Sequence, residues 1–172
     1  AVIESALKWN PWETGGGDYH GPRAISWLRQ RGIPVRGHHL LMSKFASVPA
    51  DVQRMLNERN FEGVQERILG HMRSIVSELR GQVIAWDVLN EPDYGDNFLH
   101  LFGDRKIEFI RQWFETVREA DPDAQLFVNQ AVILTRTLND EAGSMRGPFE
   151  ELLTQMVEHD VPFDAIGRRH YD

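Results

Sequence analysis

The chain has 172 residues, of which 41% are hydrophobic and 26% are charged, and its formal net charge is −7. This length and composition are typical of one globular domain with its own core. The negative charge argues against a nucleic-acid-binding protein, and no apolar run approaches the roughly 20 residues of a membrane helix. Because the chain lacks cysteine, disulfides, thiolate nucleophiles and cysteine-based metal sites are excluded. We therefore expect neither nucleic acid nor a membrane among its partners.

Short apolar runs alternate with amphipathic stretches along the whole chain. In chain order this pattern predicts a strand over residues 1–8, a Gly-rich turn at 15–17, a helix over 22–31, a strand over 34–42, a loop and then a helix over 61–80, a strand over 83–91, a helix over 105–120, a strand over 124–130, a helix over 148–159 and a strand over 163–167. The residues of the last helix that we expect to face inward are Phe149, Leu152, Leu153, Met156 and Val157. The sequence begins with Ala1 and stops at Asp172, each close to a strand-like run, so we expect a piece of a longer protein.

Apolar strands separated by helices indicate an α/β fold with a parallel sheet covered by helices. Two architectures fit this order, an open doubly wound sheet and a (β/α)8 barrel. No Gly-rich phosphate loop follows any predicted strand, which argues against the dinucleotide-binding version of the open sheet. Polar residues instead gather where the predicted strands end, and in a barrel these ends share the mouth where catalysis occurs: Glu4, Lys8, His38, His39, Asn90, Glu91, Asn129, Gln130, Arg169 and His170. We therefore favour a (β/α)8 barrel that is incomplete in this chain.

Residues 86–91, with the sequence Trp-Asp-Val-Leu-Asn-Glu, form the most informative segment. Asp87 interrupts a buried strand, and the strand ends in Asn90 and Glu91. A carboxylate at a barrel mouth suits glycoside hydrolysis, in which a general acid with a raised pKa protonates the leaving oxygen. A neighbouring Asn can donate a hydrogen bond to the sugar 2-hydroxyl in the transition state. Strand position alone leaves a second interpretation open, in which Glu91 caps the following loop or pairs with an arginine.

Five segments resemble motifs of glycoside hydrolase family ten, the xylanases, and they occur in the family's order across essentially the whole chain. Residues 86–91 resemble its acid/base strand, and residues 4–9 (Glu-Ser-Ala-Leu-Lys-Trp) are similar to its Glu-Asn-x-Met-Lys-Trp strand. Residues 35–38 resemble its Arg-Gly-His strand, residues 126–129 its Tyr-Ile-Asn-Asp strand, and residues 161–167 the approach to its Gln-x-His motif. Each match is weak alone, and the combination of five in order makes the resemblance specific.

The resemblance implies strands two to six of the barrel, with residues 1–172 forming part of a single glycoside hydrolase catalytic domain. It implies that Glu91 is the general acid/base of a retaining enzyme that cleaves β-1,4-linked plant polysaccharide, xylan above all, and that Asn90 assists in the transition state. The substrate-binding residues that it implies are Glu4, Lys8, His38, Asn129 and His170. It implies neither a cofactor nor a metal, and the family's polymeric substrates suggest that the protein is secreted, either outside the cell or into the periplasm.

Retaining enzymes need a second carboxylate as nucleophile, about 5–5.5 Å from the first. In the family this glutamate lies on the strand after this chain ends, so we expect the isolated 172 residues to be inactive. Glu13, Asp87 and Asp93 match that role poorly.

The chain departs from the family pattern around the sugar next to the scissile bond. Residues 41–44 (Leu-Met-Ser-Lys) stand where the family usually has Trp-His-Ser-Gln, so the expected Trp and His are absent. Gln130 stands where the family has Asp, and Arg169 stands where it has Gln. These departures leave open a degenerate barrel that binds glycan without cleaving it. We interpret Lys44 as part of a solvated loop.

A metal-dependent barrel hydrolase is the remaining alternative, because histidines occur at two of the strand ends and a barrel mouth could gather them with Glu91. Its ligands would come from His38, His39, Glu91 and His170. Adjacent residues of a strand point to opposite faces, so at most one of His38 and His39 would face the barrel interior. We favour His38 as a buried, hydrogen-bonded side chain that orients Glu91 or its neighbours.

Overall fold

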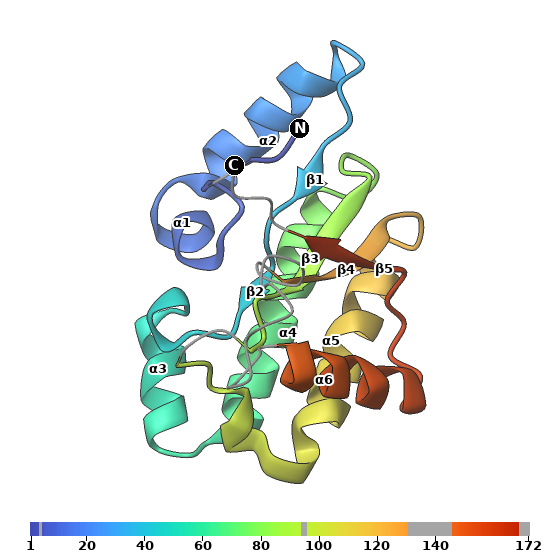
Figure 1. The fold of residues 1–172 in the computed structure, drawn as a ribbon. Helices are drawn as coiled ribbons and strands as arrows, with labels where there is room; N and C mark the ends of the chain where they lie inside the picture. The colour runs from blue at the N-terminus through green and yellow to red at the C-terminus, as the bar shows by residue number, and fades with distance from the viewer. Residues whose placement is uncertain (4, 94–95, 131–145, 169–172) are drawn as a thin grey trace, which may run out of the picture.

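The structure, a computed structural model, describes residues 1–3, 5–93, 96–130 and 146–168 (Figure 1). Its elements, in chain order, are α1 (Trp9–Thr14), α2 (Gly17–Arg29), β1 (Arg36–Gly37), β2 (Leu41–Met42), the 3₁₀ helix η1 (Phe45–Ser47), α3 (Ala50–Asn57), α4 (Phe61–Glu78), β3 (Ala85–Asn90), the 3₁₀ helix η2 (Leu99–Arg105), α5 (Lys106–Ala120), β4 (Gln125–Gln130), α6 (Arg146–Glu158) and β5 (Ala165–Arg168). None of the helices in these ranges is long and apolar enough to cross a membrane.

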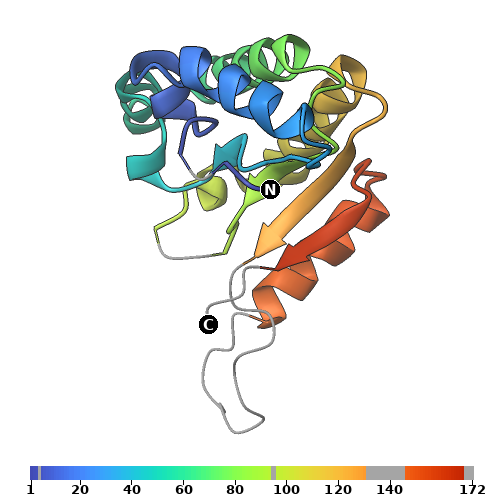
Figure 2. The same cartoon turned by 90° about the horizontal axis from the view of Figure 1, so that it is seen from above.

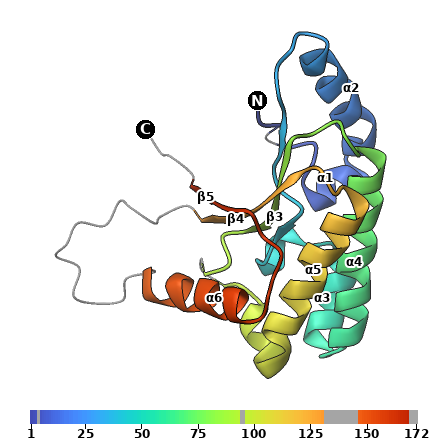
Figure 3. The ribbon, with the colours of Figure 1, turned by 90° about the vertical axis from the view of Figure 1, so that its right-hand side faces the viewer.

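The strands form one parallel sheet with the order β1-β3-β4-β5, and β2 pairs with the later part of β3. Helices α4 and α5 lie side by side along one side of this sheet (Figures 2 and 3). In a doubly wound fold, helices cover both faces of the sheet. In the part of the chain that the structure describes, the opposite side carries no helix, as expected for a segment of a barrel wall (Figure 3).

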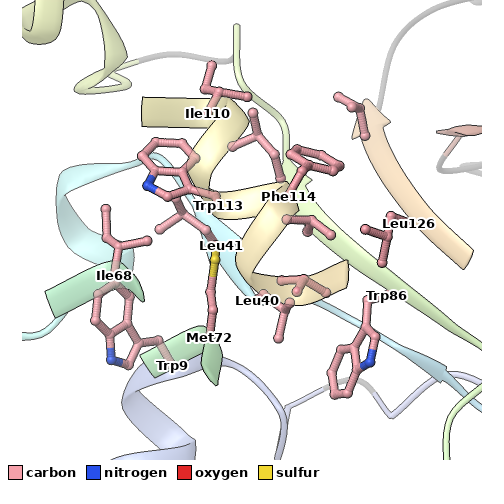
Figure 4. Packing of buried hydrophobic residues seen from close by; sticks show 14 of the residues in the cluster. Trp9, Leu40, Leu41, Ile68, Met72, Trp86, Ile110, Trp113, Phe114 and Leu126 are labelled. Atoms are coloured by element: carbon pink, nitrogen blue, oxygen red, sulfur yellow. The ribbon is translucent and has the colours of Figure 1, made fainter. Parts of the chain in front are cut away.

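The core lies between α4, α5 and the sheet. Asn60 caps α4 by accepting a hydrogen bond from the Gly63 backbone at 3.1 Å, which satisfies one of the free N–H groups of the first turn. The buried stripe of α4 meets that of α5 and the strands. The side chains labelled in Figure 4 from these elements are Leu41, Ile68, Met72, Trp86, Ile110, Trp113, Phe114 and Leu126. These stripes recur at steps of three and four, so the helices predicted over residues 61–80 and 105–120 are confirmed.

The strand predicted over residues 1–8 is wrong. The segment contributes a single parallel bridge, from Val2 to Arg36, and a turn in which the Lys8 backbone donates to Ser5 at 3.1 Å leads directly into α1. Helix α1 is fixed to α4 because the Trp9 ring stacks on His71, with ring centroids 4.5 Å apart. Burial of Trp9 in this contact outweighs the extended pattern of the preceding residues.

Two further predictions differ from the structure in their boundaries. The strand predicted over residues 34–42 is divided into β1 and β2, and the predicted loop after it contains α3, whose buried residues Val52 and Leu56 are four positions apart. Helix α2 begins at Gly17 instead of residue 22, so Pro22 lies inside it. Val157, expected to face inward, is 63% exposed because it lies beside the buried stripe of α6.

Replacement of Val117 by Ala in α5 is expected to lower the free energy of unfolding by about 2 kcal/mol, because two buried methyl groups are lost and a cavity remains. The matched control is Val157→Ala in α6, where an exposed side chain is shortened. Urea denaturation of this chain, followed by tryptophan fluorescence, measures both. An equal loss in the two variants would contradict the assigned core.

Candidate active site

Strand β3 carries the predicted acid segment, and all six of its residues are buried. Its register against β4 shifts between Asp87 and Leu89, so that Val88 is an extra residue opposite the neighbouring strand. Continuation of the initial register would place Asn90 opposite Gln130, whereas the shift places Asn90 opposite Asn129. The two amides then meet, and Asn129 Nδ2 donates to Asn90 Oδ1 at 2.6 Å. A bulge next to a functional site re-aims side chains in this way.

Glu91 follows directly and adopts a left-handed backbone conformation, with φ at 50°. This region is costly for residues other than glycine and is observed mainly where the surroundings enforce it. Here the Glu91 backbone N–H donates to the Asn129 carbonyl at 2.7 Å, which continues the ladder for one more residue. The side chain is thereby directed out of the alternating pattern of the strand at the end where a parallel sheet presents its catalytic residues.

The Glu91 carboxylate is 4% exposed at the residue level and lies opposite the Lys44 ammonium group, with Oε2 and Nζ 3.7 Å apart. Only 22% of the Lys44 side chain is exposed, so the interpretation of Lys44 as part of a solvated loop is wrong. The pairing of β2 with the end of β3 explains the approach, because Met42 lies opposite Asn90 and the next residues run alongside Glu91. A buried carboxylate thus lies beside a cation at the end of β3.

Asp87 occupies the centre of a buried charged network. Arg36 donates to Asp87 Oδ1 through Nε at 3.0 Å and through its terminal nitrogen, and His38 Nδ1 lies 2.7 Å from Asp87 Oδ2. The guanidinium of Arg36 also stacks over the ring of Phe127, 4.0 Å from its centroid. Donation from His38 Nδ1 to the carboxylate fixes the tautomer in which Nε2 is an acceptor. The structure therefore supports the interpretation of His38 as a buried, hydrogen-bonded side chain.

Two glycines make room for this network. Gly37 lies opposite Trp86, and a Cβ at position 37 would collide with the indole ring. A Cβ on Gly167 would collide with the side chains of Arg36 and Asn129. The approach of Arg36 to its neighbours therefore depends on the absence of a side chain at position 167, and Gly37 lets β1 pack against the indole of Trp86.

His39 follows His38 through a cis peptide bond, and the two imidazole rings lie edge to face with centroids 5.0 Å apart. The expectation that they point to opposite faces is wrong, because neither residue belongs to a strand. Burial, with a contribution from the nearby Lys8 cation, lowers the pKa of His39 to about 3. Across the described residues no cluster of three or more His, Cys, Asp or Glu is arranged to hold a metal ion.

The other two carboxylates considered for the nucleophile have different surroundings. Glu13 accepts hydrogen bonds from Trp9 at 2.7 Å and from Arg67 at 2.9 Å, and although burial alone would raise its pKa, these contacts hold the pKa of Glu13 below its usual value. Burial raises the pKa of Asp93, although Lys106 opposes that shift. Glu13 is therefore held in a structural ion pair.

The structure describes only some of the remaining predicted site residues. Lys8 is half-buried and lies close enough to His39 to influence its charge. Asn129 lies beside Asn90, as described above. Glu4 and His170 fall outside the described residues.

Two polar side chains that were not among the predicted catalytic or substrate-binding residues also lie at the strand ends. Ser43 follows β2, and its buried Oγ makes no hydrogen bond within the described structure. Gln130 ends β4, and both polar atoms of its buried amide lack partners there. Unpaired buried polar groups are rare and are concentrated where a ligand or water supplies the partner. Their positions after predicted strands were the only signal in the sequence.

Replacement of Asp87 by Asn is expected to lower the free energy of unfolding by about 3 kcal/mol, because Arg36 and His38 would lose the buried carboxylate that pairs them. Glu108→Gln is the control, since it breaks an exposed pair with Arg111 on α5 and is expected to change stability little. Urea denaturation at neutral pH compares the two. Equal and small effects would show that the Asp87 network does not stabilise the sheet.

Two buried histidines predict the pH dependence of stability. Burial lowers the pKa of His39 to about 3 and that of His71 to about 4, below the ordinary value of 6.5. Both stay neutral in the folded state while the unfolded chain takes up protons, so stability is fully present above about pH 6.5 and falls as the pH falls toward these values. Each contributes a slope of about 1.4 kcal/mol per pH unit in that window.

The variant His71→Phe isolates one of these contributions, because a phenyl ring preserves the stack on Trp9. The stability difference between pH 7 and pH 5 is expected to shrink by about 2 kcal/mol relative to the parent chain. Urea denaturation at both pH values provides the comparison. An unchanged difference would contradict the assigned role of His71.

Comparisons with known proteins agree with this geometry. The sequence model of the family described as Glycosyl hydrolase family 10 matches residues 1–172. Among curated proteins, Endo-1,4-beta-xylanase 3 of Hypocrea jecorina is 28% identical over 179 residues, which cover 98% of this chain and 47% of that protein. The chain thus spans about half the length of the curated relatives it matches.

Solved structures show the same fold. The structure of GH10 from Paenibacillus barcinonensis has 24% identity and a TM-score of 0.75, covering 97% of this chain and 51% of that one. A mutant of P fluorescens subsp. cellulosa xylanase A in complex with xylopentaose has 23% identity and a TM-score of 0.74, covering 97% of this chain and 50% of that one. These relatives are (β/α)8 barrels, so the prediction of an incomplete barrel is confirmed.

Proposed function

Because the chain belongs to glycosyl hydrolase family 10, we propose that the full-length protein is a retaining glycoside hydrolase that cleaves β-1,4-linked xylan. The observation that carries this proposal is the end of β3, where Asn90 is oriented by Asn129 and Glu91 is turned out of the strand. Residues 1–172 form part of its single catalytic barrel. Its substrate lies outside the cell, because a polymer of this kind does not cross a membrane.

In this proposal Glu91 is the general acid/base. Its carboxylic acid donates a proton to the glycosidic oxygen while a second carboxylate attacks the anomeric carbon, and the bond to the leaving sugar breaks. The resulting carboxylate then takes a proton from water, which attacks the anomeric carbon and releases the nucleophile. The nucleophilic glutamate is contributed by sequence beyond residue 172, so the isolated chain is inactive.

Asn90 supports the transition state through its amide nitrogen. Its Oδ1 accepts from Asn129, which turns Nδ2 toward the mouth as a donor to the sugar 2-hydroxyl. Asn129 is therefore a positioning residue as well as part of the substrate-binding wall. His38 offers Nε2 as an acceptor because Asp87 holds its other nitrogen.

Glu4, Lys8 and His170 complete the proposed set of sugar-binding residues. Lys8 lies beside His39, and a cation on a flexible stem at this position suits hydrogen bonding to sugar hydroxyls. Xylan is favoured as substrate because the curated relatives are endo-1,4-beta-xylanases and because a structural relative binds xylopentaose.

A second candidate function is glycan binding without cleavage. It is favoured by Lys44 beside Glu91 and by the orphan amide of Gln130, because both residues differ from the family pattern around the scissile bond. In this alternative the barrel retains oligosaccharide affinity but releases no reducing sugar.

Replacement of Glu91 by Gln in the full-length protein is expected to lower kcat on xylan by about 10²- to 10⁴-fold, because general acid and base assistance is lost. An aryl xyloside with an acidic phenol as leaving group needs little protonation, so its bond cleavage is expected to slow far less. Reducing-sugar release measures cleavage of xylan. The initial burst of phenol, which precedes the base-assisted hydrolysis of the intermediate, measures cleavage of the aryl bond. Equal losses on both would argue against Glu91 as the acid.

The matched control is Glu108→Gln on the exposed side of α5, which is expected to retain full activity. Binding of xylo-oligosaccharides to the Glu91→Gln protein, measured by calorimetry, separates lost chemistry from lost folding. A parent protein that binds these oligosaccharides but releases no reducing sugar would identify the non-hydrolytic alternative.

A further inference from the structure

A cavity of about 400 Å³ lies beside the candidate active site, between the segment after β2, the end of α3 and the segment that leads into η2. Its lining includes Phe45, Leu56, Asn57, Asp96, His100 and Leu101. Helix α3 lies beside β2, at the end of the sheet that holds the carboxyl ends of the strands (Figure 1). The volume of the cavity is within the range of small-molecule sites.

The cavity is connected to the candidate active site through the backbone. Asn97, which lines it, forms an antiparallel bridge with Lys44, and the Phe98 backbone donates to the Ser43 carbonyl at 2.8 Å. Lys44 in turn contacts Glu91 through its side chain at 3.7 Å. Paired segments of this kind lie about 5 Å apart, so a ligand in the cavity lies one segment away from the lysine that contacts Glu91.

The chemistry of the lining is divided between an apolar floor and a polar rim. Phe45 and Leu101 are half-buried, and the exposed side chains of Asn57, Asp96 and His100 surround them. This combination suits a sugar, whose C–H face packs on apolar side chains while its hydroxyls reach polar groups at the edge.

One rim residue is already oriented for a ligand. His100 Nδ1 lies 2.7 Å from the Asn97 carbonyl, so in the neutral imidazole Nδ1 carries the proton and Nε2 is an acceptor. Arg59 and Asp96 place opposite charges on the same rim, which gives the cavity no net preference for a charged ligand. A neutral sugar with several hydroxyl donors matches this set.

We propose that this cavity is an accessory subsite that binds one neutral sugar unit of the glycan at a position removed from the bond that is cleaved. The proposal rests on the function proposed above, and it adds a contact beyond the residues at the strand ends. It predicts that affinity depends on ligand length or branching, because only a ligand that extends past Lys44 reaches the cavity.

The experiment uses the full-length protein with Glu91→Gln, so that ligands are bound without being cleaved. Calorimetry measures the dissociation constants of linear xylotriose, linear xylohexaose and an arabinose-branched xylo-oligosaccharide. Into this background we place Asn57→Ala with His100→Ala, two exposed changes on the cavity rim. The matched control is His20→Ala, an exposed histidine on α2.

The rim changes are expected to weaken binding of the hexaose or of the branched ligand at least 5-fold and to leave xylotriose unaffected, while His20→Ala changes neither. Which of the two longer ligands responds identifies the unit as part of the main chain or as a branch. Equal affinities with and without the rim changes for all three ligands would overturn the subsite while leaving the proposed function intact. Failure of the Glu91→Gln parent to bind any of them would overturn both.

Discussion

The carboxylate of Asp87 is the constraint on which the geometry of the strand ends depends. It is 97% buried as a side chain and holds Arg36 and His38 from the segment of β1, so β3 is joined to its neighbour by charge as well as by the ladder. A buried charge without a partner would destabilise the fold strongly, and the two partners therefore fix the relative positions of these segments. The glycine at position 167 leaves room for Arg36, and the glycine at position 37 lets β1 pack against Trp86.

The bulge at Val88 connects this network to the candidate acid. Below the bulge, Asp87 keeps the initial register, and above it Asn90 is moved into line with Asn129. The backbone of Glu91 then bonds to Asn129, whose side chain also holds Asn90. Asn129 of β4 thus positions both Asn90 and Glu91. The earlier part of β3 carries the buried ion network of Asp87, and its end carries the candidate catalytic residues.

Several of these features could be predicted from the sequence because they are local. The long helices α4 and α5 follow from repeated apolar steps, and Asp87 within an apolar run marked β3 as unusual. The short elements were missed for physical reasons. Eight residues of α3 carry too little periodicity, and the extended pattern at the N-terminus is overridden by the burial of Trp9 against His71.

The contacts of the candidate site were harder to predict, because they join residues far apart in the chain. The contact of Lys44 with Glu91 depends on the pairing of β2 with the end of β3, which no local pattern encodes. The meeting of Asn90 and Asn129 depends on a one-residue register shift. The orphan atoms of Gln130 and Ser43 are visible only once burial is known.

The left-handed backbone at Glu91 has a consequence for the evolution of this position. Glycine, or to a lesser degree asparagine, would adopt φ of 50° with less strain, so a long carboxylate is retained there against the preference of the backbone. A residue without a long side chain would therefore relieve backbone strain at this position. A carboxylate at a position where the backbone favours glycine is the kind of stability cost that functional sites carry.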